Sequence, residues 1–216
     1  MLNNRLIIVL ALMLPFTASA QEGSGEAADT GSWTYIALKH SFNQRLTSTA
    51  HLELRTKENC STTDVWFFRL YNRYKILPWL TGELNLESNN ANLENGIWRN
   101  SFRIHLGGIA ALRLGDFALS TMQREYFFVV SNVEPASTHF LLSQIRVGYA
   151  PEEWRFSPYL SAFWLFRPDL FQRRLIAGTG IRVSESLSLN LYYMFKTSYP
   201  SGKNTHVAGL GLTIGI

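Results

Sequence analysis

Alternation of apolar and polar residues with a period of two is the feature that most limits how this chain can fold. Between Leu46 and Lys57, leucine and alanine predominate at the even positions, while threonine, histidine, glutamate and arginine occupy the odd ones. A similar pattern runs from Trp98 to Leu114, much longer than the about 5 to 6 residues usual for a strand in a soluble protein. Successive side chains of a β-strand point to opposite faces, so each such segment is predicted to be a strand with one apolar and one polar face.

Eleven segments carry this pattern, although one of them, Phe117–Phe128, alternates poorly. They are Ser32–Phe42, Leu46–Lys57, Val65–Ile76, Leu80–Glu87, Trp98–Leu114, Phe117–Phe128, Leu141–Tyr149, Phe156–Phe166, Leu175–Val183, Leu187–Phe195 and Ala208–Ile216. We therefore expect an all-β fold, a transmembrane antiparallel β-barrel of about twelve strands, in a range of roughly 10 to 12. Twelve is favoured because bacterial barrels normally have an even strand number, whereas an odd number leaves the first and last strands parallel. The twelfth strand would come from the region Asn89–Asn100, and ten would follow from discounting the first or the sixth segment.

The connections between these segments fall into two groups. Short turns are expected near Phe42–Arg45, Leu77–Trp79, Gly115–Asp116, Pro151–Trp154 and Ser184–Ser186, and polar loops near Asn59–Asp64, Asn89–Gly96, Ser131–Ser137, Pro168–Gln172 and Pro200–Asn204. Short turns at one rim and longer loops at the other are typical of outer-membrane barrels. Aromatic residues lie at or near the strand ends, as in the girdles of such barrels. They are Trp66, Trp79, Trp98, Trp154, Trp164, Tyr74, Tyr149 and Tyr199.

The direction of the apolar faces separates two kinds of barrel. A soluble, periplasmic lipocalin-like binding barrel would turn them inward, and periodicity alone leaves this alternative open. Two features favour a membrane barrel. The long strands suit a tilted crossing, which needs about 9 to 11 residues. The polar faces also carry arginine, glycine, serine and tyrosine rather than the lysine and glutamate expected of a surface in water.

The first 20 residues have the features of a secretory signal peptide. A polar, positive start precedes the apolar run Leu6–Leu14, and Ala18–Ala20 forms a small-residue cleavage signal. Pro15 interrupts the run, which is too short for a membrane helix. We expect cleavage after Ala20, an acidic, flexible lead-in over residues 21–31, a barrel over residues 32–216, and the outer membrane of a Gram-negative cell as the location.

A series of short motifs resembles an uncharacterised family of outer-membrane barrels, domain of unknown function 2490 (DUF2490), over roughly Trp33 to Ile216. The motifs are Trp33-Thr34, Leu52-Glu53-Leu54-Arg55-Thr56-Lys57, Tyr74-Lys75-Ile76 before Pro78-Trp79-Leu80, Gly96-Ile97-Trp98-Arg99-Asn100, Pro158-Tyr159 and His206-Val207-Ala208-Gly209-Leu210-Gly211. The resemblance implies an outer-membrane barrel without an assigned activity. The chain departs from barrels of this sort at its last residue, because they usually end on an aromatic residue and this one ends on Ile216.

The polar strand faces predict which side chains line the interior. The basic ones are Arg55, Arg69, Arg73, Lys75, Arg99, Arg103, Arg113, Arg146, Arg174, Arg182 and Lys196, and the acidic ones are Glu53, Glu83 and Glu87. Such a lumen is predominantly positive, which favours a narrow, porin-like passage or binding cavity for anions. The competing interpretation is a plugged, structural barrel, in which the arginines pair with carboxylates and carbonyl groups.

Motifs for enzymatic or cofactor chemistry are missing from the sequence. The histidines, His40, His51, His105, His139 and His206, are scattered singly and come with no metal-binding or phosphate-loop pattern, so we expect no metal and no cofactor. The enzymatic alternative is an outer-membrane lipid hydrolase of the phospholipase or lipid A deacylase type, with a serine activated by a histidine. Adjacent His40 and Ser41 would point to opposite strand faces and cannot form that pair.

The charge balance argues against nucleic acid as a partner. Lysine and arginine number 20 against 16 aspartates and glutamates, and the excess is spread along the chain. The expected partners are outer-membrane lipids and, during insertion, the barrel assembly machinery. The sequence leaves the oligomeric state open.

Overall fold

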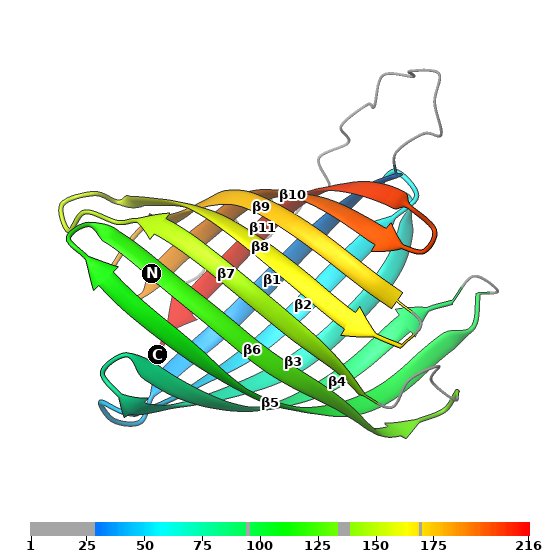
Figure 1. Ribbon diagram of the computed structural model, residues 1–216, viewed down its shortest axis with the longest axis horizontal. Coiled ribbons are helices and arrows are strands. Elements are labelled where there is room, and N and C mark those ends of the chain that lie inside the picture. Colours follow the sequence, from blue (N-terminus) through cyan, green and yellow to red (C-terminus); the bar gives the residue numbers. More distant parts are fainter. Residues whose placement is uncertain (1–28, 94–95, 134–138, 169) are drawn as a thin grey trace, which may run out of the picture.

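The computed structural model describes residues 29–93, 96–133, 139–168 and 170–216, and in these residues the chain forms eleven β-strands. They are β1 Asp29–Ser41, β2 Leu46–Lys57, β3 Thr62–Leu77, β4 Leu80–Asn92, β5 Trp98–Leu114, β6 Phe117–Ser131, β7 His139–Tyr149, β8 Phe156–Arg167, β9 Leu170–Arg182, β10 Leu187–Tyr199 and β11 Lys203–Gly215. The strands close into one barrel (Figure 1). Over the same residues, no helix has the length and apolarity needed to cross a membrane.

Each strand pairs antiparallel with its neighbour in sequence, and the barrel closes between β1 and β11. This closing pair is parallel, with a register that runs from Asp29 beside Thr205 to Lys39 beside Gly215. The expected all-β, largely antiparallel barrel is confirmed. The number of described strands, eleven, falls inside the expected range. It is one fewer than the favoured twelve. The region around Asn89–Asn100 adds no strand, because β4 continues to Asn92 and β5 begins at Trp98.

The two rims of the barrel are named here after the ends of the described chain. Ile216 lies at the C-terminal rim, where its amide donates to the Lys39 carbonyl, and β1 begins at the opposite, N-terminal rim. Connections 42–45, 78–79, 115–116, 150–155 and 183–186 lie at the C-terminal rim, and strands β2, β4, β6, β8 and β10 end at the other. The described connections at the two rims overlap in length, so the division into short turns and long loops is weaker than the sequence indicated.

Strand extension at the N-terminal rim explains this difference. β4 runs past the expected end at Glu87, β9 and β11 begin before the expected Leu175 and Ala208, and β10 continues beyond Phe195. The added residues are mostly polar on both faces, so they lack the alternation that marks a strand in sequence. β1 likewise begins at Asp29, within the segment expected to be the lead-in. The expected signal peptide and residues 21–28 lie outside the described residues.

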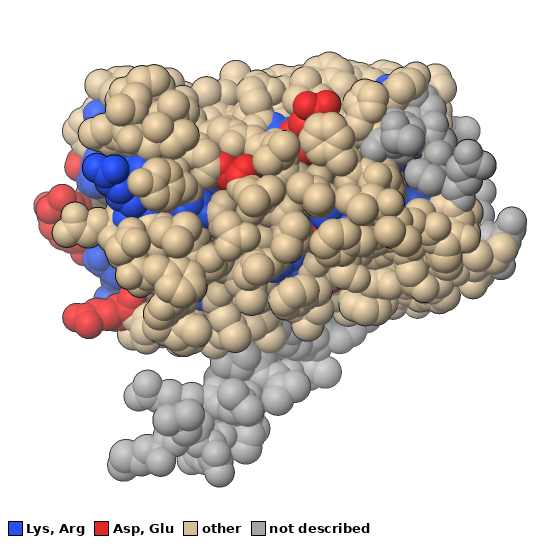
Figure 2. Space-filling view, turned by 90° about the horizontal axis from the view of Figure 1, so that it is seen from below, with Lys and Arg blue, Asp and Glu red and all other residues tan. Residues whose placement is uncertain are grey.

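Large apolar side chains cover the outside of the barrel. Leu52, Phe68, Leu84, Leu106 and Leu160 are all about half exposed or more, at 47% to 65% of their surface. Their neighbours in sequence point inward, in agreement with the alternation. Most of the side shown in Figure 2 is uncharged, and charged side chains gather at its left end, the C-terminal rim. The sheet therefore has an apolar outer face and a polar inner face.

Two tyrosine rings lie over glycines of β11, one of the two strands that close the barrel. Tyr35 on β1 is paired with Gly211 on β11, and Tyr192 on β10 with Gly209 on β11. A Cβ atom at either glycine would be only 2.0 Å from the Cζ atom of the tyrosine ring. β11 can therefore pass beneath both rings only because these positions have no side chain.

We predict that Gly211→Ala destabilises the barrel by about 1 to 3 kcal/mol, because the added methyl group displaces the Tyr35 ring from its packed position. Gly180→Ala is the matched control, since a Cβ atom there would lie 3.9 Å from its nearest neighbour, Ser157. The measurement is urea unfolding of the detergent-folded protein, followed by heat-modifiable migration on gels. Equal midpoints for the two variants would contradict the packing argument.

Candidate functional site

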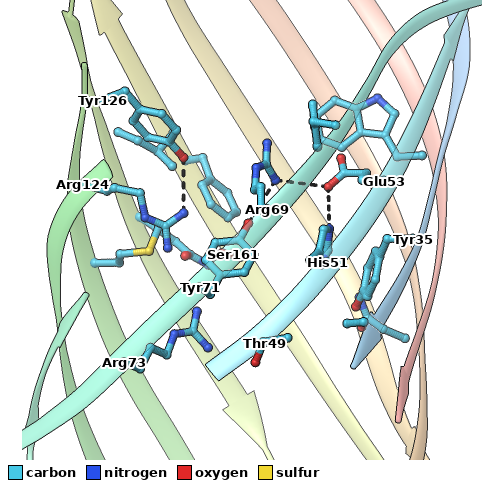
Figure 3. A pocket seen from close by; sticks show the side chains of 18 of the residues that line it. Tyr35, Thr49, His51, Glu53, Arg69, Tyr71, Arg73, Arg124, Tyr126 and Ser161 are labelled. Carbon is cyan, nitrogen blue, oxygen red and sulfur yellow. Dashed lines mark hydrogen bonds and ion pairs between the residues drawn. The ribbon is translucent and has the colours of Figure 1, made fainter. Parts of the chain in front are cut away.

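The barrel encloses a cavity of about 800 Å³, to which all eleven strands contribute inward-facing side chains (Figure 3). Its lining extends from Arg45 and Lys75 near the C-terminal rim to Ala91 and Arg99 near the N-terminal rim. Twelve basic residues line it, Lys39, Arg45, Arg55, Arg69, Arg73, Lys75, Arg99, Arg103, Arg124, Arg146, Arg167 and Arg174. Among the described lining residues the one carboxylate is Glu53.

Glu53 is the centre of a first group of ion pairs in the wall formed by β2 and β3. One oxygen accepts from Arg55 Nε at 2.7 Å, and the other lies 3.0 Å from His51 Nε2 and 3.3 Å from Arg69 Nη1. Tyr35 stacks on the His51 ring with 4.6 Å between the ring centroids. The carboxylate thus has three charged or polar partners, and its negative charge is shared among them.

Glu87 on β4 extends this network deeper into the wall. Its side chain is fully buried and accepts from Arg69 Nε on β3 and, at 3.0 Å, from Arg103 Nη1 on β5. His105 Nε2 lies 3.6 Å away. Arg103 also donates to Asn89 Oδ1 at 3.0 Å. Four adjacent strands, β2 to β5, are therefore tied together inside the barrel by alternating carboxylates and guanidinium groups.

A third carboxylate, Glu83 on β4, forms a second group nearer the C-terminal rim. It accepts from Arg73 Nε at 2.7 Å and from Arg124 Nη2 at 2.6 Å. Arg124 lies on β6, and it donates to the hydroxyl of Tyr126 at 3.3 Å. Figure 3 shows Arg73 and Arg124 on either side of Tyr71, whose hydroxyl accepts from Arg69.

The opposite wall, formed by β7 to β11 and β1, has a different charge pattern. Two of its basic side chains lie on aromatic rings: the Arg146 guanidinium carbon is 3.7 Å from the centre of the Tyr159 ring, and that of Arg174 is 5.2 Å from Trp33. No carboxylate on these strands lines the cavity, as far as the chain is described. The described carboxylates of the interior therefore lie on one wall.

The residues predicted to line the lumen occupy three kinds of position. Eight of the basic residues line the cavity, namely Arg55, Arg69, Arg73, Lys75, Arg99, Arg103, Arg146 and Arg174, as does Glu53. Glu83 and Glu87 lie in the buried ion pairs described above. Lys196 is the cross-strand partner of Arg174 but is not part of the lining.

Arg113 and Arg182 lie elsewhere, at the C-terminal rim. Arg113 donates to the carbonyls of Gly115 and Ala150, and Arg182 to those of Glu152 and Trp154. They hold the connection 150–155 to the rim. Alternation places both residues on the polar face, but it carries no information about how near the rim a position lies.

Sequence reasoning missed Arg124, which lines the cavity and carries the second ion-pair group. The reason is that the outward positions of β6 include Gln123 and Glu125, so both faces of this strand are polar near its middle. The tight hairpin at Gly115–Asp116 was the available signal, because it sets the register of β6 against β5 and thereby the facing of each residue.

In the described part of the chain, His40 and His206 contact groups other than a serine. His40 Nδ1 lies 3.0 Å from the Ile216 carbonyl oxygen, Ser41 contacts Thr47, and His206 contacts Tyr193. Within the described residues no group of three potential ligands could hold a metal ion.

Taken together, these features define a closed β-barrel with an apolar exterior and an arginine-rich interior. A model of the family described as protein of unknown function (DUF2490) matches residues 30–207, from the start of β1 into β11. The chain belongs to this family, as the sequence motifs indicated. A search of curated proteins found no match.

We predict that Glu87→Gln lowers the free energy of unfolding by about 3 to 5 kcal/mol, because it leaves the buried guanidinium group of Arg103 without its carboxylate and Arg69 with Glu53 alone. Asp64→Asn is the control. Its partner Lys57 is 3.8 Å away in a solvent-accessible pair, so a change within about 1 kcal/mol is expected. Denaturant titration of both variants in the same detergent tests this, and similar losses in the two would contradict it.

Proposed function

We propose that this protein is an outer-membrane β-barrel whose interior admits and passes small anions. The observation that carries the proposal is the excess of basic over acidic side chains around the cavity, twelve against one among the described lining residues. Fixed positive charge in a confined, low-dielectric passage attracts anions and repels cations.

The apolar exterior supports a membrane location. Exposure of these leucine and phenylalanine side chains to water is unfavourable. In a membrane, lipid acyl chains cover them without that cost. Aromatic residues flank this surface: Trp79 and Trp154 lie in connections at the C-terminal rim, and Trp98 and Tyr199 at strand ends near the other. This distribution is typical of the two interfaces of a membrane barrel.

The ion pairs on β2 to β6 support a narrow passage rather than a wide channel. They fix the positions of arginines that line the cavity on that side, which limits the space between the two walls. A cavity of this size accommodates small solutes and not polymers or large nutrients.

The membrane location is tested by Leu106→Arg, on the outer face of β5. In a bilayer an arginine near the middle of the apolar belt is expected to cost about 2 to 4 kcal/mol and to reduce the membrane-inserted, heat-modifiable form. Asn100→Arg, at the N-terminal end of the same strand, should have little effect. Recovery of the wild-type chain as a soluble protein without detergent, with Leu106→Arg harmless, would contradict the proposal.

Anion passage is tested by reversal potentials in planar bilayers under a salt gradient. The wild-type barrel should give a small conductance that favours chloride over potassium. Arg146→Gln combined with Lys75→Gln should weaken this preference, because both side chains line the cavity and neither has a carboxylate within ion-pair distance in the described structure. Arg113→Gln combined with Arg182→Gln removes the same charge at the rim and should preserve the preference more closely. A folded, inserted barrel that gives no conductance would refute the passage and leave a plugged barrel.

A further inference from the structure

Closure of the barrel brings two arginines from distant parts of the sequence together at one tryptophan, with a lysine on the strand beside one of them. Trp33 on β1 is largely buried, with 9% of its surface exposed. The guanidinium carbon of Arg55, on β2, lies 3.6 Å from the centre of its ring, and that of Arg174, on β9, lies 5.2 Å from it. Lys196, on β10, is the direct cross-strand partner of Arg174.

These three charges are poorly neutralised by the protein. Neither Arg174 nor Lys196 has a carboxylate within ion-pair distance among the described residues. Arg55 binds Glu53, but the same carboxylate also serves Arg69 and His51. Like charges placed directly opposite on neighbouring strands destabilise a sheet, so a bound anion would stabilise the Arg174 and Lys196 pair.

The cluster is also held in place. Gln172 accepts from Arg174 Nε at 2.7 Å, and its amide nitrogen donates to Ser198 Oγ at 3.0 Å. The Trp33 ring supports the guanidinium groups through cation–π contacts. With Arg174 Nε engaged by Gln172, the terminal nitrogens of its guanidinium group are left to bind a ligand. Trp33, Arg55 and Arg174 line the cavity, so a solute that enters it reaches this point.

We propose that Arg55 and Arg174, which flank Trp33 in the cavity, form a binding site for a polyvalent oxyanion of the phosphate type, with Lys196 adding positive charge from the strand beside Arg174. Guanidinium groups bind tetrahedral oxyanions with paired hydrogen bonds, and a lysine adds a compact positive charge. Three cations with one shared carboxylate favour a divalent ion over chloride. The site deepens the proposed function, since it gives the anion passage a discrete binding step.

Isothermal titration of the full-length, detergent-folded barrel with inorganic phosphate tests the site. The titration is run at constant ionic strength, with sodium chloride as the reference anion. Saturable binding near one phosphate per chain is expected. Arg174→Gln and Lys196→Gln should each weaken it about tenfold or more, because each removes a charge-assisted contact. Arg182→Gln, on the same strand as Arg174 but at the C-terminal rim, should retain the wild-type affinity.

Thermal unfolding gives a second measurement on the same proteins. Phosphate should raise the unfolding temperature of the wild type, because it binds only the folded barrel, and should leave that of Arg174→Gln nearly unchanged. Arg174→Lys keeps the charge without the planar fork and should bind with intermediate affinity. The proposed site would be wrong if the heat released on adding phosphate matched that of chloride, or if all variants bound phosphate with equal affinity.

Failure of the site and failure of the passage give different results, since binding in detergent requires no conduction. A barrel that binds phosphate but carries no current retains the site and loses the passage. A barrel that selects anions but shows no saturable phosphate binding retains the passage and loses the site.

Discussion

Closure of the sheet between β1 and β11 is the constraint on which the rest of the structure depends. A strand at the edge of an open sheet exposes a row of unpaired amide and carbonyl groups, which is costly in water and more so in a membrane. The parallel pairing from Asp29 to Lys39 removes both edges at once. It also decides which face of every strand is inside, because side chains alternate strictly along each strand.

The charged interior follows from that closure and then stabilises it. Three carboxylates, Glu53 on β2 and Glu83 and Glu87 on β4, hold arginines from β2, β3, β5 and β6. A buried charge without a partner strongly destabilises the folded state. These ion pairs therefore offset the desolvation cost of the buried arginines and add little net stability. On the opposite side Arg146 lies on the Tyr159 ring and Arg174 near Trp33, and no carboxylate of those strands lines the cavity in the described part of the chain. The difference between the two walls links the fold to the proposed selection of anions.

The sequence predicted the architecture more accurately than it predicted the site. All eleven strands were found, because alternation of side chains is a local property of each segment. The strand ends at the C-terminal rim were close, since apolar residues continue up to the turns there. At the N-terminal rim β4, β9, β10 and β11 are longer than expected, because polar residues on both faces give no alternation and pairing with a neighbouring strand alone keeps them extended. Arg124 was missed for the same reason, and the rim positions of Arg113 and Arg182 depend on strand stagger, which is not a local property.

The sequence by itself determined that this chain forms a barrel of amphipathic strands with an oily face and an arginine-rich face. That outcome is local, since it needs only the period of two and the residue types at each position. Only the tertiary structure decided how the barrel closes, which carboxylate pairs with which arginine, and that Arg55 and Arg174 meet at Trp33. These contacts join strands far apart in the chain, and they exist because the shear and curvature of a closed sheet bring those strands together.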